Sequence, residues 1–226
     1  MSSERLYENL IAEAAQNALV PLGFQRKSRS RTWFADQGWW LVVAEFQPSA
    51  GRRGAFLNVG AKWLWRGDDV WRLDFSFHPA ARAANFEEFE NESQFRDASS
   101  RLAQTAVDEA RRLREAFRSI HAVAELLRER AAVRADGWDL YHAGVAAFLA
   151  GRSNEAHRYF TRLSVPMSAD SSWLVQLRVT ARALADMCGE RQRLSELLKE
   201  QLHRSRAAMR LRTWNGEIPG ASLHAV

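Results

Sequence analysis

The sequence contains a single cysteine, Cys188, so no disulfide can form within the chain. Such scarcity is typical of a reducing compartment, and we expect Cys188 to be a small buried apolar residue, not a nucleophile. No apolar run approaches the roughly 18 to 20 residues that cross a bilayer. The N-terminal stretch MSSERLYENL has a glutamate where a secretory signal would be basic and then apolar. These absences predict a cytoplasmic protein.

The motifs of several enzyme classes are also missing. There is no Gly-rich phosphate loop ending in Lys-Ser/Thr, no His-Glu-x-x-His pair and no set of cysteines for zinc. The six histidines are scattered, and only His142 and His157 are spaced to face each other across a predicted helical hairpin. Two such histidines are more commonly ordinary surface or boundary residues than a metal site. The sequence therefore predicts no cofactor and no metal, and it favours a protein without catalytic activity.

Lysine is scarce too, because only three of the 32 basic residues are lysine. The net charge of +5 and the pI near 10.0 would suit a protein that binds nucleic acid. However, 27 acidic residues are spread among the basic ones, and pairs such as Asp97 with Arg101 have the i,i+4 spacing of helical ion pairs. Most of this charge is interpreted as solvated surface.

Aromatic residues are concentrated in one stretch, since six of the nine tryptophans lie between positions 33 and 71. Apolar and polar residues alternate there in two segments, 57–63 and 71–77, which predicts strands with one covered and one solvated face. The polar, Gly-containing segments 48–54 and 66–69 indicate turns. We therefore predict a meander of four strands near residues 31–36, 38–47, 54–65 and 70–78.

The rest of the chain has the 3.6-residue periodicity of helices. One helix is predicted over 4–20, and a long one follows the His78-Pro79 pair and spans roughly 95–117. Five more are predicted: one from a cap at Ser119 through 132, then 138–150, 154–164, 171–188 and 190–211. The predicted fold is α+β: an N-terminal helix, a four-stranded antiparallel sheet covered by helices, and an all-helical C-terminal section. The predicted divisions are 1–134, 135–212 and a flexible tail at 213–226.

The first section resembles a known bacterial family over roughly residues 4–130. The stretches LVPLGFQRKSRSRTWF and VVAEFQPSAGRRGAFLNVGAKW are similar to the family called domain of unknown function 4304. The matching positions are a Gly-Phe pair, a basic stretch, an aromatic strand, a glutamine that ends a strand and an Asn-x-Gly strand: Gly23, Phe24, Arg26, Lys27, Trp33, Phe34, Gln47, Asn58 and Gly60. The resemblance implies an α+β domain with an antiparallel sheet and implies no activity.

The segment 138–163 is similar to one tetratricopeptide-type helical hairpin. Small and large residues fall at that repeat's packing positions, at Gly144, Gly151, Ala156, Phe160 and Leu163. Ala147 stands where the repeat usually has an aromatic residue, and no second copy matches. Because such repeats need about three copies to be stable alone, we expect a helical bundle docked on the first domain.

Three candidate functions follow from these patterns. The favoured one is a non-enzymatic module that binds another protein through the outer sheet face or the helical hairpin. Trp39 and Trp40 are its candidate contacts, because neighbours on a strand point to opposite faces and one ring is left outside the core. The second is nucleic-acid binding through basic loops at 26–31 and 52–53, with Arg26, Lys27, Arg29, Arg31, Arg52 and Arg53 as the contacts. The third is a hydrolase with an unfamiliar pair of carboxylates, for which the four glutamates of 85–92 are candidates, although a solvated acidic loop explains them as well.

Overall fold

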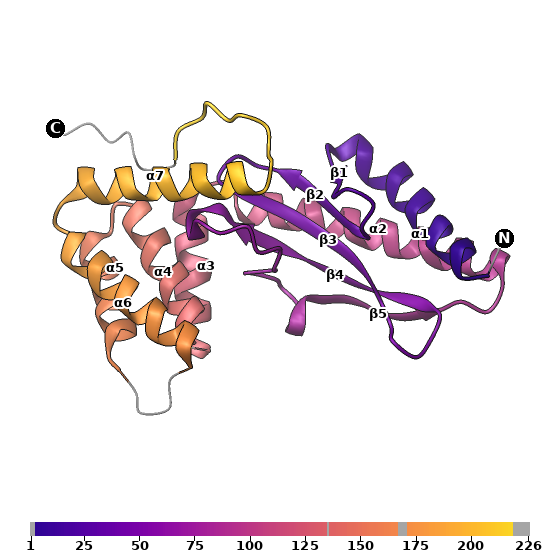
Figure 1. The fold of residues 1–226 in the computed structure, drawn as a ribbon, viewed down its shortest axis with the longest axis horizontal. Helices are drawn as coiled ribbons and strands as arrows, with labels where there is room; N and C mark the ends of the chain where they lie inside the picture. Colours follow the sequence, from indigo (N-terminus) through magenta and orange to yellow (C-terminus); the bar gives the residue numbers. More distant parts are fainter. Residues whose placement is uncertain (1–2, 135, 167–170, 219–226) are drawn as a thin grey trace. The chain divides into compact units, whose positions relative to one another are not determined.

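The computed structural model describes residues 3–134, 136–166 and 171–218 of the chain (Figure 1). The chain forms two compact units, the first of residues 1–115 and 208–211 and the second of 116–207 and 212–226. The predicted boundary after residue 134 falls within the second unit, and part of the predicted tail lies outside the described residues. The predicted α+β architecture, with a helical C-terminal section, is confirmed.

The first unit is built on an antiparallel sheet of five strands in meander order (Figure 1). The strands are β1 (Gln25–Arg26), β2 (Thr32–Asp36), β3 (Trp40–Pro48), β4 (Gly54–Trp63) and β5 (Arg82–Glu88). β3 and β4 are the central pair, with Trp40 opposite Trp63 and Pro48 opposite Ala55. Both strands are buried over almost their whole length, so the sheet has two covered faces.

The prediction of four strands was wrong at three elements. The segment 70–78 is no strand, because it meets the sheet at a single bridge between Ala61 and Phe75. β1 and β5 were missed: β1 has two residues, and β5 reads RAANFEE, which shows no apolar alternation because it is a half-exposed edge strand. The apolar residues of 71–77 alternate for another reason: Trp71 and Leu73 pack over the second face of the sheet, whereas Phe77 lies against Arg112 of the long helix that follows.

We call residues 64–79 the covering segment. Its approach to the sheet depends on Gly60, where a Cβ atom would lie 2.3 Å from the carbonyl oxygen of Phe75. The segment also supplies Trp71, whose ring lies 5.1 Å from that of Phe34 on β2. Because this face is covered, Lys62 on β4 has no exposed side-chain surface.

Buried ion pairs hold the covering segment in place. Lys62 Nζ lies 2.7 Å from Asp68 Oδ1, and Arg66 lies 2.7 Å from Asp68 and 2.9 Å from Asp74. Asp74 also accepts a 2.9 Å hydrogen bond from the backbone N–H of Trp63. Two cations thus share two carboxylates, as buried charges require. The stretch RGDD is therefore more than a turn, because its arginine and first aspartate belong to this network.

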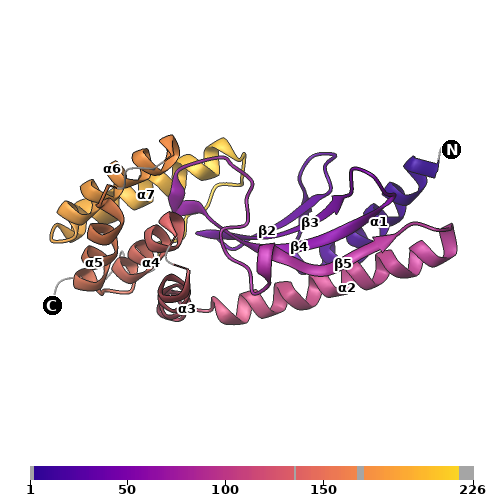
Figure 2. The ribbon, with the colours of Figure 1, turned by 90° about the horizontal axis from the view of Figure 1, so that it is seen from below.

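The other face of the sheet is packed against two helices, α1 (Ser3–Leu19) and α2 (Glu92–Ala116), and Figure 2 shows α2 along this face. They lie side by side and run in the same direction, since Tyr7 contacts Phe95 near their starts and Arg114 donates to the Leu22 carbonyl beyond the end of α1. Asn91 caps α2 by accepting a 3.0 Å hydrogen bond from the N–H of Gln94.

The second unit consists of α3 (Ile120–Val133), α4 (Gly137–Leu149), α5 (Ser153–Ser164), α6 (Ser172–Met187) and α7 (Arg191–Ala208). These bounds agree with the predicted helices to within a few residues, and Ser119 caps α3 as predicted. Helices α3 to α6 each pack on the next, whereas α7 runs across them (Figure 1). Among the described residues, no helix combines the length and apolarity that crossing a membrane requires.

Candidate functional site

The two tryptophans predicted as partner contacts lie in an aromatic cluster. The Trp39 ring stacks on those of Trp63 and Trp65, at centroid distances of 5.8 and 5.5 Å, and the Trp40 ring lies 6.1 Å from Trp39. Trp39 is 8% exposed and Trp40 is 3% exposed. Their area therefore contributes to packing, and neither ring is offered to a partner in this structure.

The expectation that these two rings point to opposite faces was wrong. It assumed that both residues belong to one strand, but β3 begins at Trp40 and Trp39 lies in the turn before it. Gly38 has a φ of 87°, and the irregular backbone there turns the Trp39 ring toward the same cluster as Trp40.

The two basic loops lie at the same end of the sheet, because alternate turns of a meander share an end. The backbone N–H of Phe46 donates a 3.0 Å hydrogen bond to the carbonyl of Arg31, which places the first loop beside the end of β3. The second loop, 49–53, joins β3 to β4 directly beyond this point. The geometry thus gathers the predicted nucleic-acid contacts into one region.

Acidic partners reduce the positive charge of that region. Arg31 forms an ion pair with Glu8 of α1, and Arg52 lies 3.3 Å from Glu88 of β5. Arg26 is engaged within its own loop, where its Nε donates a 2.7 Å hydrogen bond to the Ser30 carbonyl. Of the other three predicted contacts, Arg29 and Arg53 are exposed, and Lys27 is half-buried in a pocket described below. The region is one of mixed charge.

Three of the four glutamates considered for acid–base chemistry pair with arginines. Glu87 and Glu88 belong to β5, and Glu92 is the first residue of α2, so part of the stretch expected as a loop is regular structure. Glu87 pairs with Arg101 at 3.1 Å, and Glu92 pairs with Arg96 at 2.9 Å. Glu88 lies 3.3 Å from Arg52, so three of the four carboxylates contact a guanidinium, an arrangement that does not favour two of them acting on one substrate.

The histidines and the cysteine have structural surroundings. His142 is buried and stacks on Trp138 at 5.8 Å, whereas His157 faces the Ala185 carbonyl at 3.1 Å. No group of three potential metal ligands occurs in the part of the chain that the structure describes. Cys188 is buried, and burial raises the pKa of its thiol to about 11.

The helical hairpin of α4 and α5 packs closely around a glycine. A Cβ atom on Gly144 would lie 2.5 Å from the ring of Phe160, so the large residue of α5 fills the space that the small residue of α4 leaves. This is the small-to-large packing that the tetratricopeptide-like spacing predicted at these two positions. The hairpin is thereby a rigid support for α6, which packs on α5.

The outer side of α6 carries two valines exposed to solvent and four positions apart, and we call Val175 and Val179 the α6 patch. Their exposed fractions are 50% and 59%. The buried stripe of this helix is formed by other residues, among them Leu177, Ala181 and Leu184. The sequence analysis missed this patch, although the signal was available: the two valines lie off the stripe that predicts the helix.

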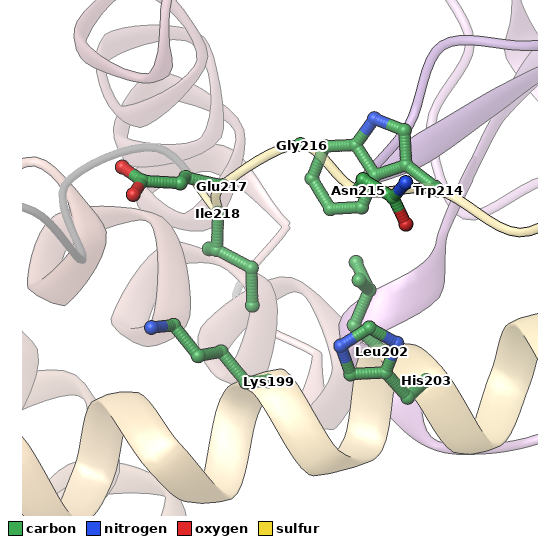
Figure 3. A pocket seen from close by; sticks show the side chains of 8 residues that line it. All are labelled: Lys199, Leu202, His203, Trp214, Asn215, Gly216, Glu217 and Ile218. Atoms are coloured by element: carbon green, nitrogen blue, oxygen red, sulfur yellow. The ribbon is translucent and has the colours of Figure 1, made fainter.

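A pocket of about 380 Å³ lies between α7 and the segment 214–218 (Figure 3). Figure 3 shows Lys199 and Glu217 at one end of this α7 pocket and His203 with Trp214 at the other. Its charged side chains are exposed, so water screens them, and one wall has no helix or strand to fix it. These features make it a weaker candidate for a ligand than its volume suggests.

In comparisons with known proteins, no family model, no curated protein and no solved structure matches the chain. The resemblance to the family called domain of unknown function 4304 therefore stays a prediction.

Proposed function

We propose that the protein is a non-enzymatic protein–protein interaction module whose partner binds the α6 patch. The observation that carries this proposal is the exposure of Val175 and Val179, each at half or more, on one side of a single helix. Single apolar residues on a surface are common, but two exposed apolar residues at i,i+4 spacing form a continuous contact area.

The helix that carries the patch is anchored on its neighbours before any partner binds. The Trp173 ring stacks on that of Trp138 in α4, with centroids 6.3 Å apart and planes 7° from parallel. Arg178 of α6 donates a 2.7 Å hydrogen bond to the Leu163 carbonyl at the end of α5 and also donates to the Val165 carbonyl. A surface ordered in advance loses less conformational entropy when it binds, which favours affinity.

The partner that fits this patch is another protein with an apolar surface. Burying the exposed half of each valine contributes roughly 1 kcal/mol. We place the complex in the cytoplasm, because the lone cysteine is suited to a reducing compartment. Nucleic-acid binding remains the second candidate, supported by the shared end of the two basic loops and opposed by the ion pairs of Arg31 and Arg52.

Affinity purification with matched variants tests the proposal. The test variant is V175E/V179E, which places two carboxylates in the patch, and the control is V133E, at an isolated valine of α3 that is 86% exposed. We expect a protein retained by the wild type and by V133E, and its retention reduced at least about tenfold by V175E/V179E, since buried carboxylates without partners are costly. Circular dichroism of each variant checks that the helices are intact.

Two outcomes would contradict the proposal. One is equal retention of every recovered protein by the wild type and by V175E/V179E. The other is a turnover found in a substrate screen together with no retained protein, which would make the chain an enzyme.

A further inference from the structure

A second pocket lies in the first unit, between the sheet and the covering segment. Its volume is about 220 Å³, and it is lined by residues of the first basic loop, of β2 and β3, and of the covering segment: Lys27, Thr32, Val43, Glu45, Trp71, Arg72 and Leu73. We call it the sheet pocket. Unlike the α7 pocket, its floor consists of two paired strands, with Thr32 directly opposite Glu45.

The amine of Lys27 is placed over the pocket by its loop. The Lys27 N–H donates a 2.9 Å hydrogen bond to the Thr32 carbonyl, and the Lys27 carbonyl accepts from both the N–H and the hydroxyl of Ser30. Lys27 Nζ lies 4.5 Å from the centroid of the Trp71 ring. Partial burial lowers the pKa of Lys27, while the charges of Glu45 and Asp69 act in the opposite direction.

The carboxylate of Glu45 is fixed by a buried amide. Asn58 is 7% exposed, and its Nδ2 donates to Glu45 Oε2 at 3.1 Å and to Gln47 Oε1 at 2.9 Å. Both hydrogens of the amide are thereby used to hold neighbouring side chains. Glu45 is consequently oriented by a group that solvent hardly reaches.

The two charges line one pocket and, in the part of the chain that the structure describes, form no direct ion pair with each other. Lys27 is stabilised by the Trp71 ring and by the more distant charges of Glu45 and Asp69, and Glu45 by the amide of Asn58. A ligand that carries both an anionic and a cationic group would add a direct, charge-assisted hydrogen bond at each of the two side chains.

The size and the walls of the pocket narrow the ligand class. A cavity of about 150 Å³ holds benzene, and drug-sized ligands occupy about 300 to 1,000 Å³, so 220 Å³ corresponds to a molecule somewhat larger than benzene. Val43, Trp71 and Leu73 supply apolar wall, and Arg72 supplies a second cation beside Lys27.

We propose that the sheet pocket binds a free α-amino acid. The carboxylate of the ligand binds Lys27 and Arg72, its ammonium group binds Glu45, and its side chain packs against Trp71 and its apolar neighbours. This site is independent of the α6 patch, which belongs to the other unit.

Calorimetric titration of the full chain with the twenty L-amino acids tests the site, using for each binder its N-acetyl and carboxamide derivatives. We expect saturable binding of at least one amino acid and at least tenfold weaker binding of both derivatives, because each lacks one charge. E45Q and K27M should each weaken binding at least tenfold. K199M removes a lysine from the α7 pocket and should leave the affinity unchanged.

The proposal is overturned if no amino acid binds, or if both derivatives bind as well as the parent. It is equally overturned if K199M weakens binding while K27M does not, because the ligand would then occupy the α7 pocket. Should E45Q fail to fold, the derivatives and K27M still decide the question. None of these results bears on retention of a protein by the α6 patch.

Discussion

The ion-pair network beneath the covering segment gives the sharpest prediction, for the substitution Asp74→Ala. The side chain of Asp74 is 1% exposed, and it accepts hydrogen bonds from Arg66 Nη1 and from the Trp63 N–H, both at 2.9 Å. Removing it leaves two cations, Lys62 and Arg66, with the single carboxylate of Asp68.

The size of the effect follows from that imbalance. Breaking a buried pair by removing one partner costs about 3 to 5 kcal/mol, because the remaining charge is uncompensated. Arg66 retains Asp68, whose side chain is 26% exposed and partly solvated. We therefore expect a loss of about 3 kcal/mol in the free energy of unfolding of the first unit. Asp69→Ala is the control, because Asp69 is an exposed aspartate of the same segment. This substitution should change the free energy of unfolding by less than about 0.5 kcal/mol.

Urea denaturation followed by tryptophan fluorescence measures this loss, since six of the nine tryptophans belong to the first unit. Hydrogen exchange at the Trp63 amide, which loses its acceptor in Asp74→Ala, should become faster. Exchange in α4, which belongs to the other unit, should not change. In the double variant R66M/D74L, where both partners become apolar, we expect a smaller loss than the sum of the single variants. If Asp74→Ala costs no more than Asp69→Ala, the network does not hold the covering segment and the reasoning is refuted.

Three further predictions concern other parts of the chain. Gly144→Ala should lower the free energy of unfolding by about 1 to 3 kcal/mol through overpacking against Phe160, less a gain of up to about 1 kcal/mol in helix propensity, and adding F160L should recover part of the loss. Gly189→Ala is the control and should cost far less, because a Cβ atom there meets nothing within 4 Å. Equal losses for the two variants in urea denaturation would contradict this prediction. Cys188 in the folded chain should be alkylated at pH 8 at least about 100-fold more slowly than in urea, because the rise in pKa from 9.0 to about 11 leaves about one hundredth of the thiolate. Since the folded state keeps this proton, the free energy of unfolding should also fall as pH rises from about 9 toward 11. A folded-state alkylation rate equal to that in urea would exclude the buried site. For single-stranded DNA, the slope of log affinity against log salt should be well short of the roughly −4 that six phosphate contacts would give, and a slope near −4 would instead support the basic loops as a nucleic-acid site.

The sequence predicted the helices better than the sheet because their signals differ in strength. Each helix carries a buried stripe over many residues, whereas β1 has two residues and β5 is an edge strand without alternation. The alternation in 71–77 was real but came from packing across the sheet, and no local rule separates that from hydrogen-bonded pairing. Asp74 shows the difference: its position predicted a solvated face, yet its side chain is 1% exposed.

The candidate sites were less predictable, because they depend on which distant residues meet. The basic loops looked free of acid along the chain, but Glu8 lies 23 positions from Arg31 and Glu88 lies 36 positions from Arg52. Lys27 was predicted as a contact from its charge alone, whereas its pocket exists because the fold brings Glu45 and Trp71 beside it. A sequence shows which groups are present, whereas their pairing is decided by the register of the strands.

The order of the strands also bears on how the chain avoids aggregation. The longest and most apolar strands, β3 and β4, lie in the interior of the sheet, where both of their edges already have a neighbour. One outer strand is only two residues long, and the other carries register shifts and the charged residues Arg82, Glu87 and Glu88. Short, charged or irregular edges are poor templates for the addition of a foreign strand, so the first unit can hold a very apolar sheet without inviting fibrils.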